Sequence, residues 1–230
     1  MRNIARRAEA WRCLADCHAD IALLQEAAES PADLATRFEI GPAPWHTAGA
    51  GVNRRWRAAV VKLSDRVAVE WIPAKLISHS SPGELAVSRE GTLAVAVVRP
   101  VDGESLVVGS MYTLWERPHI STKRRRLIYA DASVHRVISD LSMLIGEEHR
   151  IVVAGDLNCF YGYGEHGSQY WASRYATVFG RMSVLGFFFV GPQAPGGRRA
   201  DPWPEELPQS SNNVPTYYVC PPTLWRRMWR

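Results

Sequence analysis

The stretch Ile151-Val-Val-Ala-Gly-Asp-Leu-Asn158 carries the most informative pattern in the sequence. Its first five residues form a compact apolar run of strand length, which predicts a buried β-strand. Asp156 and Asn158 follow directly. Residues two apart in an extended chain point to the same side. A carboxylate and an amide would therefore share one site at the carboxyl end of the strand, where open α/β sheets bind ligands. The alternative is an Asp-Leu-Asn turn with no chemical role.

A second buried strand is predicted over Asp20-Ile-Ala-Leu-Leu-Gln25, and Glu26 follows it at once. A hard cation such as Mg²⁺ needs oxygen ligands and usually takes only one or two carboxylates. Glu26 meets that demand. A lone glutamate after a strand is more commonly a solvated loop residue or a helix cap, so Glu26 is a candidate ligand only together with other residues.

In chain order, these stretches resemble two motifs of the endonuclease/exonuclease/phosphatase family of metal-dependent phosphoesterases. The segment Asp20–Glu26 resembles the family's "DIxxLQE" strand, and Gly155–Asn158 resembles its "GDxN" motif. Asn3 and Tyr112 are weaker, single-residue matches to an asparagine and a tyrosine of the family. The resemblance covers roughly residues 3–190.

The resemblance implies an α/β fold: a two-sheet sandwich flanked by helices, in four layers. It also implies hydrolysis of a phosphodiester or a phosphomonoester. Glu26 and Asn3 would bind Mg²⁺ or Mn²⁺. Asp156 would orient and deprotonate a water molecule, while Asn158 and Tyr112 would contact the phosphate. For Tyr112 the alternative is a strand-end aromatic residue with no catalytic role.

The sequence departs from the family at both ends. Only two residues precede Asn3, so we expect the family's first strand not to form. After Asn158 the sequence has one aspartate, Asp201, and one histidine, His166, and it lacks the family's Ser-Asp-His tripeptide. We therefore expect a truncated chain, incomplete in its N- and C-terminal strands, with weak activity or none. The alternative function is a catalytically inactive remnant, or a phosphate- or nucleic-acid-binding module, of the same fold.

Other apolar patterns predict alternating helices and strands in an α/β domain. Helical periodicity is found over 4–18, 124–146 and 170–184. Runs typical of strands occur near 58–63, 67–72, 92–99, 105–112 and 185–190. A turn at Asp102-Gly103 predicts a hairpin, and the Gly- and Pro-rich segment 41–54 predicts a loop.

The composition changes after Val190. Eight of the 15 prolines lie between Pro192 and Pro222, which leaves little room for a sheet strand. We therefore expect a family-like domain over residues 1–190 and a Pro/Gly-rich loop with an Arg/Trp-rich tail over residues 191–230.

The overall charge indicates little about partners. The chain has 230 residues, is 47% hydrophobic and 22% charged, and carries a net charge of +4 from 27 basic and 23 acidic residues, which is typical of a globular protein. Three of the arginines lie in the last eight residues, so the remainder is close to neutral (24 basic against 23 acidic). The run Lys123–Arg126 is either a nucleic-acid contact or a solvated helix face. We expect a phosphate-ester substrate, with DNA and RNA among the open choices.

The ends and the cysteines predict a cytoplasmic protein. No apolar run approaches the ~18 residues of a membrane span, and no apolar stretch follows the basic N-terminus as in a secretory signal. Four cysteines are too few for a disulfide framework. We expect Cys13 and Cys17 to be buried, inert thiols. Nothing in the sequence indicates an obligate protein partner or a membrane partner.

Overall fold

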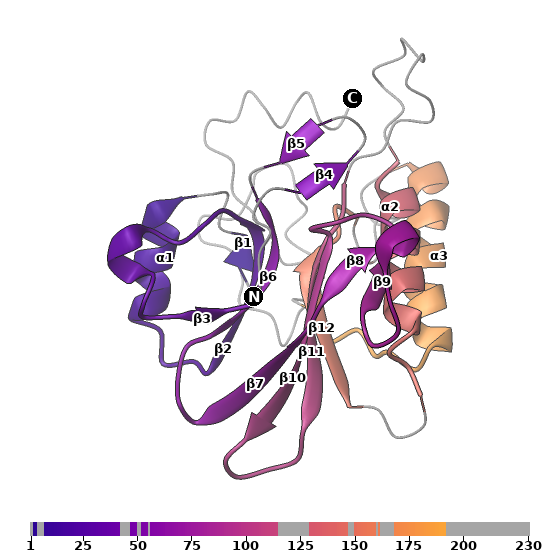
Figure 1. Ribbon diagram of the computed structural model, residues 1–230. Helices are drawn as coiled ribbons and strands as arrows, with labels where there is room; N and C mark the ends of the chain where they lie inside the picture. The colour runs from indigo at the N-terminus through magenta and orange to yellow at the C-terminus, as the bar shows by residue number, and fades with distance from the viewer. Residues whose placement is uncertain are drawn as a thin grey trace, which may run out of the picture. The chain divides into compact units, whose positions relative to one another are not determined.

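The computed structural model describes residues 2–3, 7–41, 47–49, 52–54, 56–114, 129–146, 150–159, 161 and 168–191 (Figure 1). The chain forms two compact units, Met1–Cys159 and Phe160–Arg230. Both main sheets lie in the first unit. The domain boundary expected at residue 190 stays a prediction.

The first sheet has four strands in the order β1-β2-β6-β3. Their bounds are Arg2–Asn3 (β1), Ile21–Ala27 (β2), Arg57–Lys62 (β6) and Glu39–Ile40 (β3). β2 and β6 are antiparallel, whereas β1 runs parallel to β2 and places Asn3 opposite Gln25. The prediction that no strand forms before the helix is therefore wrong, because two residues suffice to pair with the end of β2.

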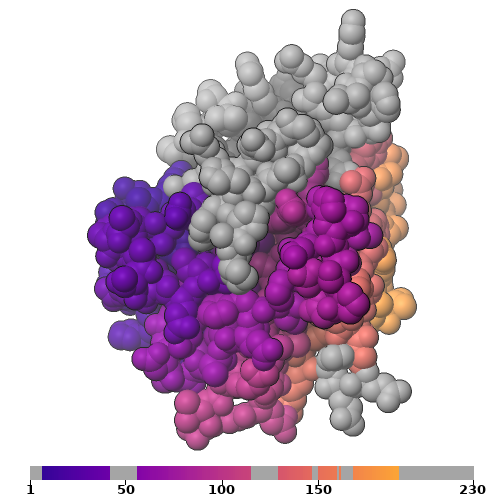
Figure 2. Space-filling model, viewed as in Figure 1, coloured from indigo at the N-terminus to yellow at the C-terminus, as the bar shows by residue number. Residues whose placement is uncertain are grey.

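The second sheet has the order β12-β11-β10-β7. Its strands are Ile151–Asp156 (β12), Leu106–Tyr112 (β11), Leu93–Pro100 (β10) and Val67–Ile72 (β7). β10 and β11 are antiparallel, which confirms the predicted hairpin, and the turn between them lies at the surface (Figure 2). β12 adds to β11 in parallel, with Tyr112 opposite Asp156.

The two sheets face each other across an apolar core. Leu23 and Val60 of the first sheet pack with Ala96, Val98 and Val108 of the second. Side chains alternate between the faces of a strand, so each sheet keeps a second face for helices. The predicted α/β sandwich is confirmed.

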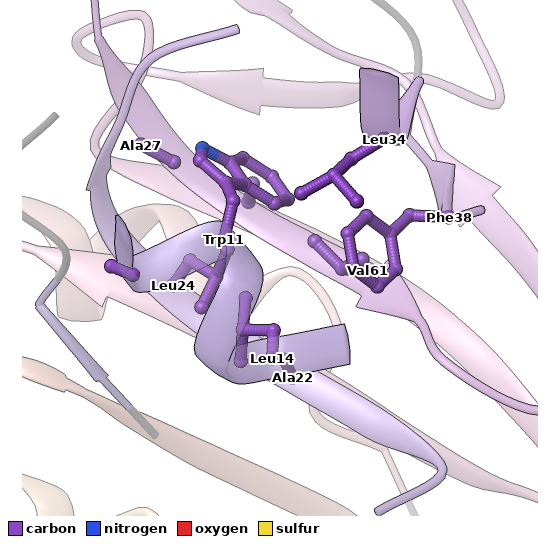
Figure 3. Close-up of a cluster of buried hydrophobic side chains, with 10 residues drawn as sticks. Trp11, Leu14, Ala22, Leu24, Ala27, Leu34, Phe38 and Val61 are labelled. Carbon is purple, nitrogen blue, oxygen red and sulfur yellow. The ribbon is translucent and has the colours of Figure 1, made fainter. Parts of the chain in front are cut away.

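Helix α1 (Ala8–Ala15) covers the other face of the first sheet. Trp11, only 1% exposed, packs with Phe38 and with Leu24 of β2 (Figure 3). The helix is shorter than the predicted 4–18: residues 4–6 lie outside the described part, and Asp16 already follows the last turn. The prediction that Cys13 and Cys17 are buried is wrong, because both lie on the exposed side of this segment.

Helix α2 (Ala130–Ser142) is anchored at both ends by side-chain hydrogen bonds. Ser133 Oγ accepts from the Leu114 amide at 2.9 Å, just beyond the end of β11. Asp140 accepts from the amide and the hydroxyl of Ser88 at 3.0 and 2.9 Å. The helix was predicted over 124–146. Residues 124–128 lie outside the described part, and the helix ends before residue 143.

Short elements complete the first unit. They are the antiparallel pair β4 (Thr47–Gly49) and β5 (Val52–Arg54), the parallel pair β8 (Ala74–Leu76) and β9 (Leu85–Val87), and the 3-10 turns η1 (Ala32–Leu34) and η2 (Ile77–His79). The β4–β5 pair corrects the prediction of an unbroken loop over 41–54.

The second unit contains α3 (Gln169–Val184). Gly186 adopts φ 85 and ends this helix, because its amide and that of Phe187 donate back to Ser183 and Met182 carbonyls. The strand predicted over 185–190 is wrong: no described strand pairs with these residues, and Phe188 and Val190 are exposed. Among the described residues, no helix has the length and apolar character needed to cross a membrane.

Candidate active site

The predicted site residues gather at the carboxyl ends of three strands. Glu26 lies near the end of β2, Tyr112 ends β11 and Asp156 ends β12. β11 and β12 are parallel and place Tyr112 directly opposite Asp156. Strand β2 lies across the sandwich from both β11 and β12. Three polar side chains therefore reach one end of the inter-sheet space.

Glu26 reaches this end because β2 contains a bulge. Leu24 pairs with Ala59 but Ala27 pairs with Arg57, so β2 has one residue more than β6 over this interval. Leu24 and Ala27 both pack on the α1 side. In a regular strand Glu26, two residues after Leu24, would share the face of Leu24, and Ala27 would lie on the opposite face. The extra residue re-aims Glu26 away from α1, as bulges beside functional sites commonly do.

A hydrogen bond then joins the two sheets at the site. Tyr112 Oη donates to Glu26 Oε1 at 3.1 Å. The Tyr112 ring is itself fixed, since it is 8% exposed and Trp56 packs edge-to-face on it with ring centroids 4.7 Å apart. The Glu26 carboxylate is thus held in a defined place at this end of the two sheets.

Asp156 and Asn158 form a local turn that orients both side chains. The backbone amide of Asn158 donates to Asp156 Oδ1 at 3.1 Å, and the side-chain Nδ2 of Asn158 donates to the Thr113 carbonyl at 2.7 Å. The Thr113 amide donates to the Asp156 carbonyl at 3.0 Å, which continues the β11–β12 pairing past the strand ends. The turn after β12 is thus tied to the chain that follows β11.

Gly155 makes this close pairing possible. A Cβ at residue 155 would lie 1.9 Å from the carbonyl oxygen of Met111, a backbone atom of the neighbouring strand. No side chain fits there without separating β11 from β12. Close packing of β12 against β11 therefore requires glycine at the first position of the Gly155–Asn158 motif.

Backbone conformation singles out the same residues. Among the described residues, the non-glycine positions with positive φ are Glu26 and Asn158, both at 50°. Such conformations cost of order 1–3 kcal/mol each and cluster at functional sites. Two candidate residues from strands far apart in sequence share this feature. The coincidence favours a functional reading over an ordinary turn.

The site offers oxygen rather than sulfur chemistry. Cys159 lies next to Asn158, and burial together with the negative charges of Asp131 and Asp156 raises the pKa of its thiol to about 12. The thiol is therefore protonated at neutral pH and is a poor nucleophile and a poor metal ligand. The described residues contain no group of three or more His, Cys, Asp and Glu side chains that would enclose a metal.

Of the predicted residues, the structure brings together Glu26, Tyr112, Asp156 and Asn158. Asn3 is placed one strand away, opposite Gln25, and its side chain lies outside what is described. The segments holding His166, Asp201 and Lys123–Arg126 lie outside the described residues as well.

Two residues that sequence reasoning missed stand beside the site. Gln25 and Ser110 are fully buried and hydrogen-bond to each other across the sheets. The available signal was their polarity, since Gln25 directly follows the apolar run of β2 and Ser110 lies within the mainly apolar β11.

Comparison with known proteins supports the fold. No protein-family model and no curated protein sequence matches the chain. The endonuclease domain of TRAS1, a telomere-specific non-LTR retrotransposon, superposes with a TM-score of 0.52 at 18% identity, over 83% of this chain and 71% of that domain. At this identity the likeness shows a shared fold.

Two further solved structures resemble the chain more distantly. ANGEL2, a 2',3'-cyclic phosphatase, gives a TM-score of 0.41 at 16% identity, over 85% of this chain and 55% of its own. Humanized D. rerio TDP2 gives 0.39 at 14% identity, over 76% and 59%.

Proposed function

The chain has the endonuclease/exonuclease/phosphatase fold, and from that premise we propose that its site hydrolyses phosphate esters with the help of a divalent metal ion. One observation carries the proposal: Glu26, Tyr112, Asp156 and Asn158 converge from three strand ends, and two of them hold left-handed backbone conformations. Such strain persists only where the surroundings enforce it.

The donor set fits Mg²⁺ or Mn²⁺. Glu26 and Asp156 supply carboxylate oxygens at one end of the sandwich, and Mg²⁺ usually binds through one or two carboxylates while keeping several waters. Glu26 would hold the ion, with Asn3 of the adjacent strand as the second ligand. When bound, the ion would neutralise phosphate charge and favour ionisation of water.

The residues of the chain have separable roles in this proposal. Asp156 would accept a proton from the attacking water, and its carboxylate is already oriented by the Asn158 amide. Asn158, whose side chain is held by the hydrogen bond from Nδ2 to the Thr113 carbonyl, would contact a phosphate oxygen. The Tyr112 hydroxyl, held beside Glu26, would contact the same phosphate.

The substrate class we propose to test first is a nucleic-acid phosphodiester. The support is the likeness in fold to an endonuclease domain. Inositol phosphates and lipid headgroups are the other phosphate esters to compare, because a fold does not fix its substrate. Binding without turnover would support the alternative of an inactive phosphate-binding module.

The experiment measures hydrolysis of a generic phosphodiester and of labelled DNA and RNA, with Mg²⁺ and with EDTA. Asp156→Asn should lower turnover ~10²–10⁴-fold, the usual contribution of a positioned acid–base group. Glu26→Gln should lower turnover as well, because it removes the carboxylate that would hold the metal ion. Asp20→Asn and Glu39→Gln are matched controls, because these acids pair with Arg66 and Lys62 away from the site. Turnover that survives both site substitutions would refute the assignment.

A further inference from the structure

Gln25 is a polar side chain buried between the two sheets. It is 0% exposed and follows the apolar run Ile21–Leu24 of β2. Its Nε2 donates to Ser110 Oγ at 3.0 Å and to the Leu23 carbonyl at 3.3 Å. Ser110 Oγ donates in turn to the Leu24 carbonyl at 2.7 Å. The two bonds made by Ser110 join β2 to β11 across the core.

The bridge lies directly behind the candidate site. Gln25 immediately precedes Glu26, and Ser110 lies two residues before Tyr112 on the same face of β11. The Gln25–Ser110 bond and the Glu26–Tyr112 bond are therefore successive links between the same two strands. The inner link restrains how far apart the outer pair can lie.

The bridge is not the arrangement that stability alone would favour. Gln25 Oε1 is buried and has no hydrogen-bond partner among the described residues. A buried acceptor left without a partner lowers stability, whereas an apolar side chain of similar shape would avoid that cost. A glutamine here implies a need for the bond that Nε2 makes.

We propose that Gln25 is a positioning residue of the site: through Ser110 it fixes the separation of β2 and β11, and so the place of the Glu26 carboxylate. This inference rests on the proposed function, since it concerns the same metal-binding carboxylate. Residues that orient metal ligands typically change metal affinity 10–100-fold when they are replaced.

The test compares Gln25→Met with Ser88→Ala in the full chain. Met keeps the length of the side chain and removes the bond. Ser88 also bonds across two elements, to Asp140 of α2, but away from the site. The Kd for Mn²⁺ is measured by electron paramagnetic resonance, and stability is measured by urea unfolding.

We expect Gln25→Met to weaken Mn²⁺ binding about 10-fold or more with its unfolding midpoint unchanged or raised. Ser88→Ala should lower the midpoint and leave the Kd unchanged. Ser110→Ala should weaken binding as well, and the double variant should bind no worse than Ser110→Ala, because Ser110→Ala already removes the bond to Gln25.

The Kd for Mn²⁺ of Glu26→Gln, measured in the same way, distinguishes a failure of the positioning role from a failure of the proposed metal site. If Glu26→Gln weakens Mn²⁺ binding and Gln25→Met does not, the positioning role is overturned and the proposed metal site stands. If Glu26→Gln leaves the Kd unchanged, the proposed site fails and the positioning role fails with it. An equal loss of affinity in Ser88→Ala would also overturn the role, since the effect would then follow stability alone.

Discussion

Strand β2 serves two regions of the molecule that are built in opposite ways. On one face, Ala22, Leu24 and Ala27 pack beneath α1 in an apolar cluster around Trp11 (Figure 3). On the other, Gln25 and Glu26 carry hydrogen bonds to the second sheet, and Glu26 has a left-handed backbone. The face of β2 beneath α1 is packed with apolar side chains. The end of β2 that carries Gln25 and Glu26, which we call the site end, instead has buried polar groups and an unusual backbone conformation.

The two regions contribute differently to the free energy of folding. Under α1, burial of apolar area and close packing lower the free energy of the folded state. At the site end, a bulge, two strained residues and a buried acceptor without a partner all raise it. Substitutions in the two regions should therefore have opposite signatures.

The largest expected effect is on the α1 face. Trp11→Ala should lower the free energy of unfolding by ~3–5 kcal/mol, because it leaves a cavity beneath the helix. Urea unfolding would measure this loss. The Kd for Mn²⁺ of the folded protein, determined below the unfolding transition, should be unchanged. Weaker Mn²⁺ binding by the folded variant would mean that the two regions are coupled.

Gly155→Ala should disrupt the pairing of β11 with β12 at the site end through a steric clash. The new Cβ would meet the Met111 carbonyl oxygen, and forced overpacking typically costs ~1–3 kcal/mol. Because β11 and β12 must separate, metal affinity should fall together with stability.

Gly180→Ala on α3 is the matched control for that change. Its Cβ would meet nothing within 4 Å, so it should stabilise the helix by about 1 kcal/mol. Equal behaviour of the two alanine variants would contradict the steric role of Gly155.

Glycine in place of alanine should raise the free energy of unfolding at residue 26 and lower it in α1. At residue 26, Glu26→Gly should be more stable than Glu26→Ala by about 1 kcal/mol, because only glycine adopts φ 50 without strain. In α1, Ala10→Gly should lose about 1 kcal/mol, as in any helix interior. Both comparisons use urea unfolding. A Glu26→Gly variant less stable than Glu26→Ala would argue against a strained residue 26.

The smallest effect concerns thiol reactivity. Cys13 and Cys17 are exposed, whereas the pKa of Cys159 is raised to about 12. At pH 8, iodoacetamide should modify the first two in the folded protein and spare Cys159, as mass spectrometry of the peptides would show. Rapid labelling of Cys159 without unfolding would contradict the raised pKa of this half-buried thiol.

The same pKa shift fixes the sign of a pH effect. The unfolded thiol loses its proton near pH 8.5 and the folded one only near 12. Cys159 therefore contributes a loss of stability as the pH rises between those values.

Most of the site strands could be predicted from the sequence. The apolar runs ending in Glu26 and Asp156 signalled buried strands with polar ends, and both form as expected. Their pattern is local, because it depends on residues within one strand. The convergence of the two ends was carried by the family resemblance rather than by the patterns themselves.

The features beyond local pattern were missed. The bulge at Glu26 depends on the register with β6, and the Gln25–Ser110 bond joins residues 85 apart in sequence. The composition of the apolar run over 185–190 is as typical of a strand as that of the runs that do form strands. It pairs with no described strand, because forming a strand also requires a neighbouring strand to pair with. Helix ends failed for a related reason, since periodicity does not mark where a helix stops.

Diffraction from crystals soaked in Mn²⁺, recorded near the manganese absorption edge, tests the central claim most directly. If the site end of the sandwich holds a metal ion, as we propose, an anomalous peak should lie beside the carboxylates of Glu26 and Asp156 and should be lost in Glu26→Gln crystals. A saturating soak with no peak at those carboxylates, or with one unchanged by Glu26→Gln, would contradict it.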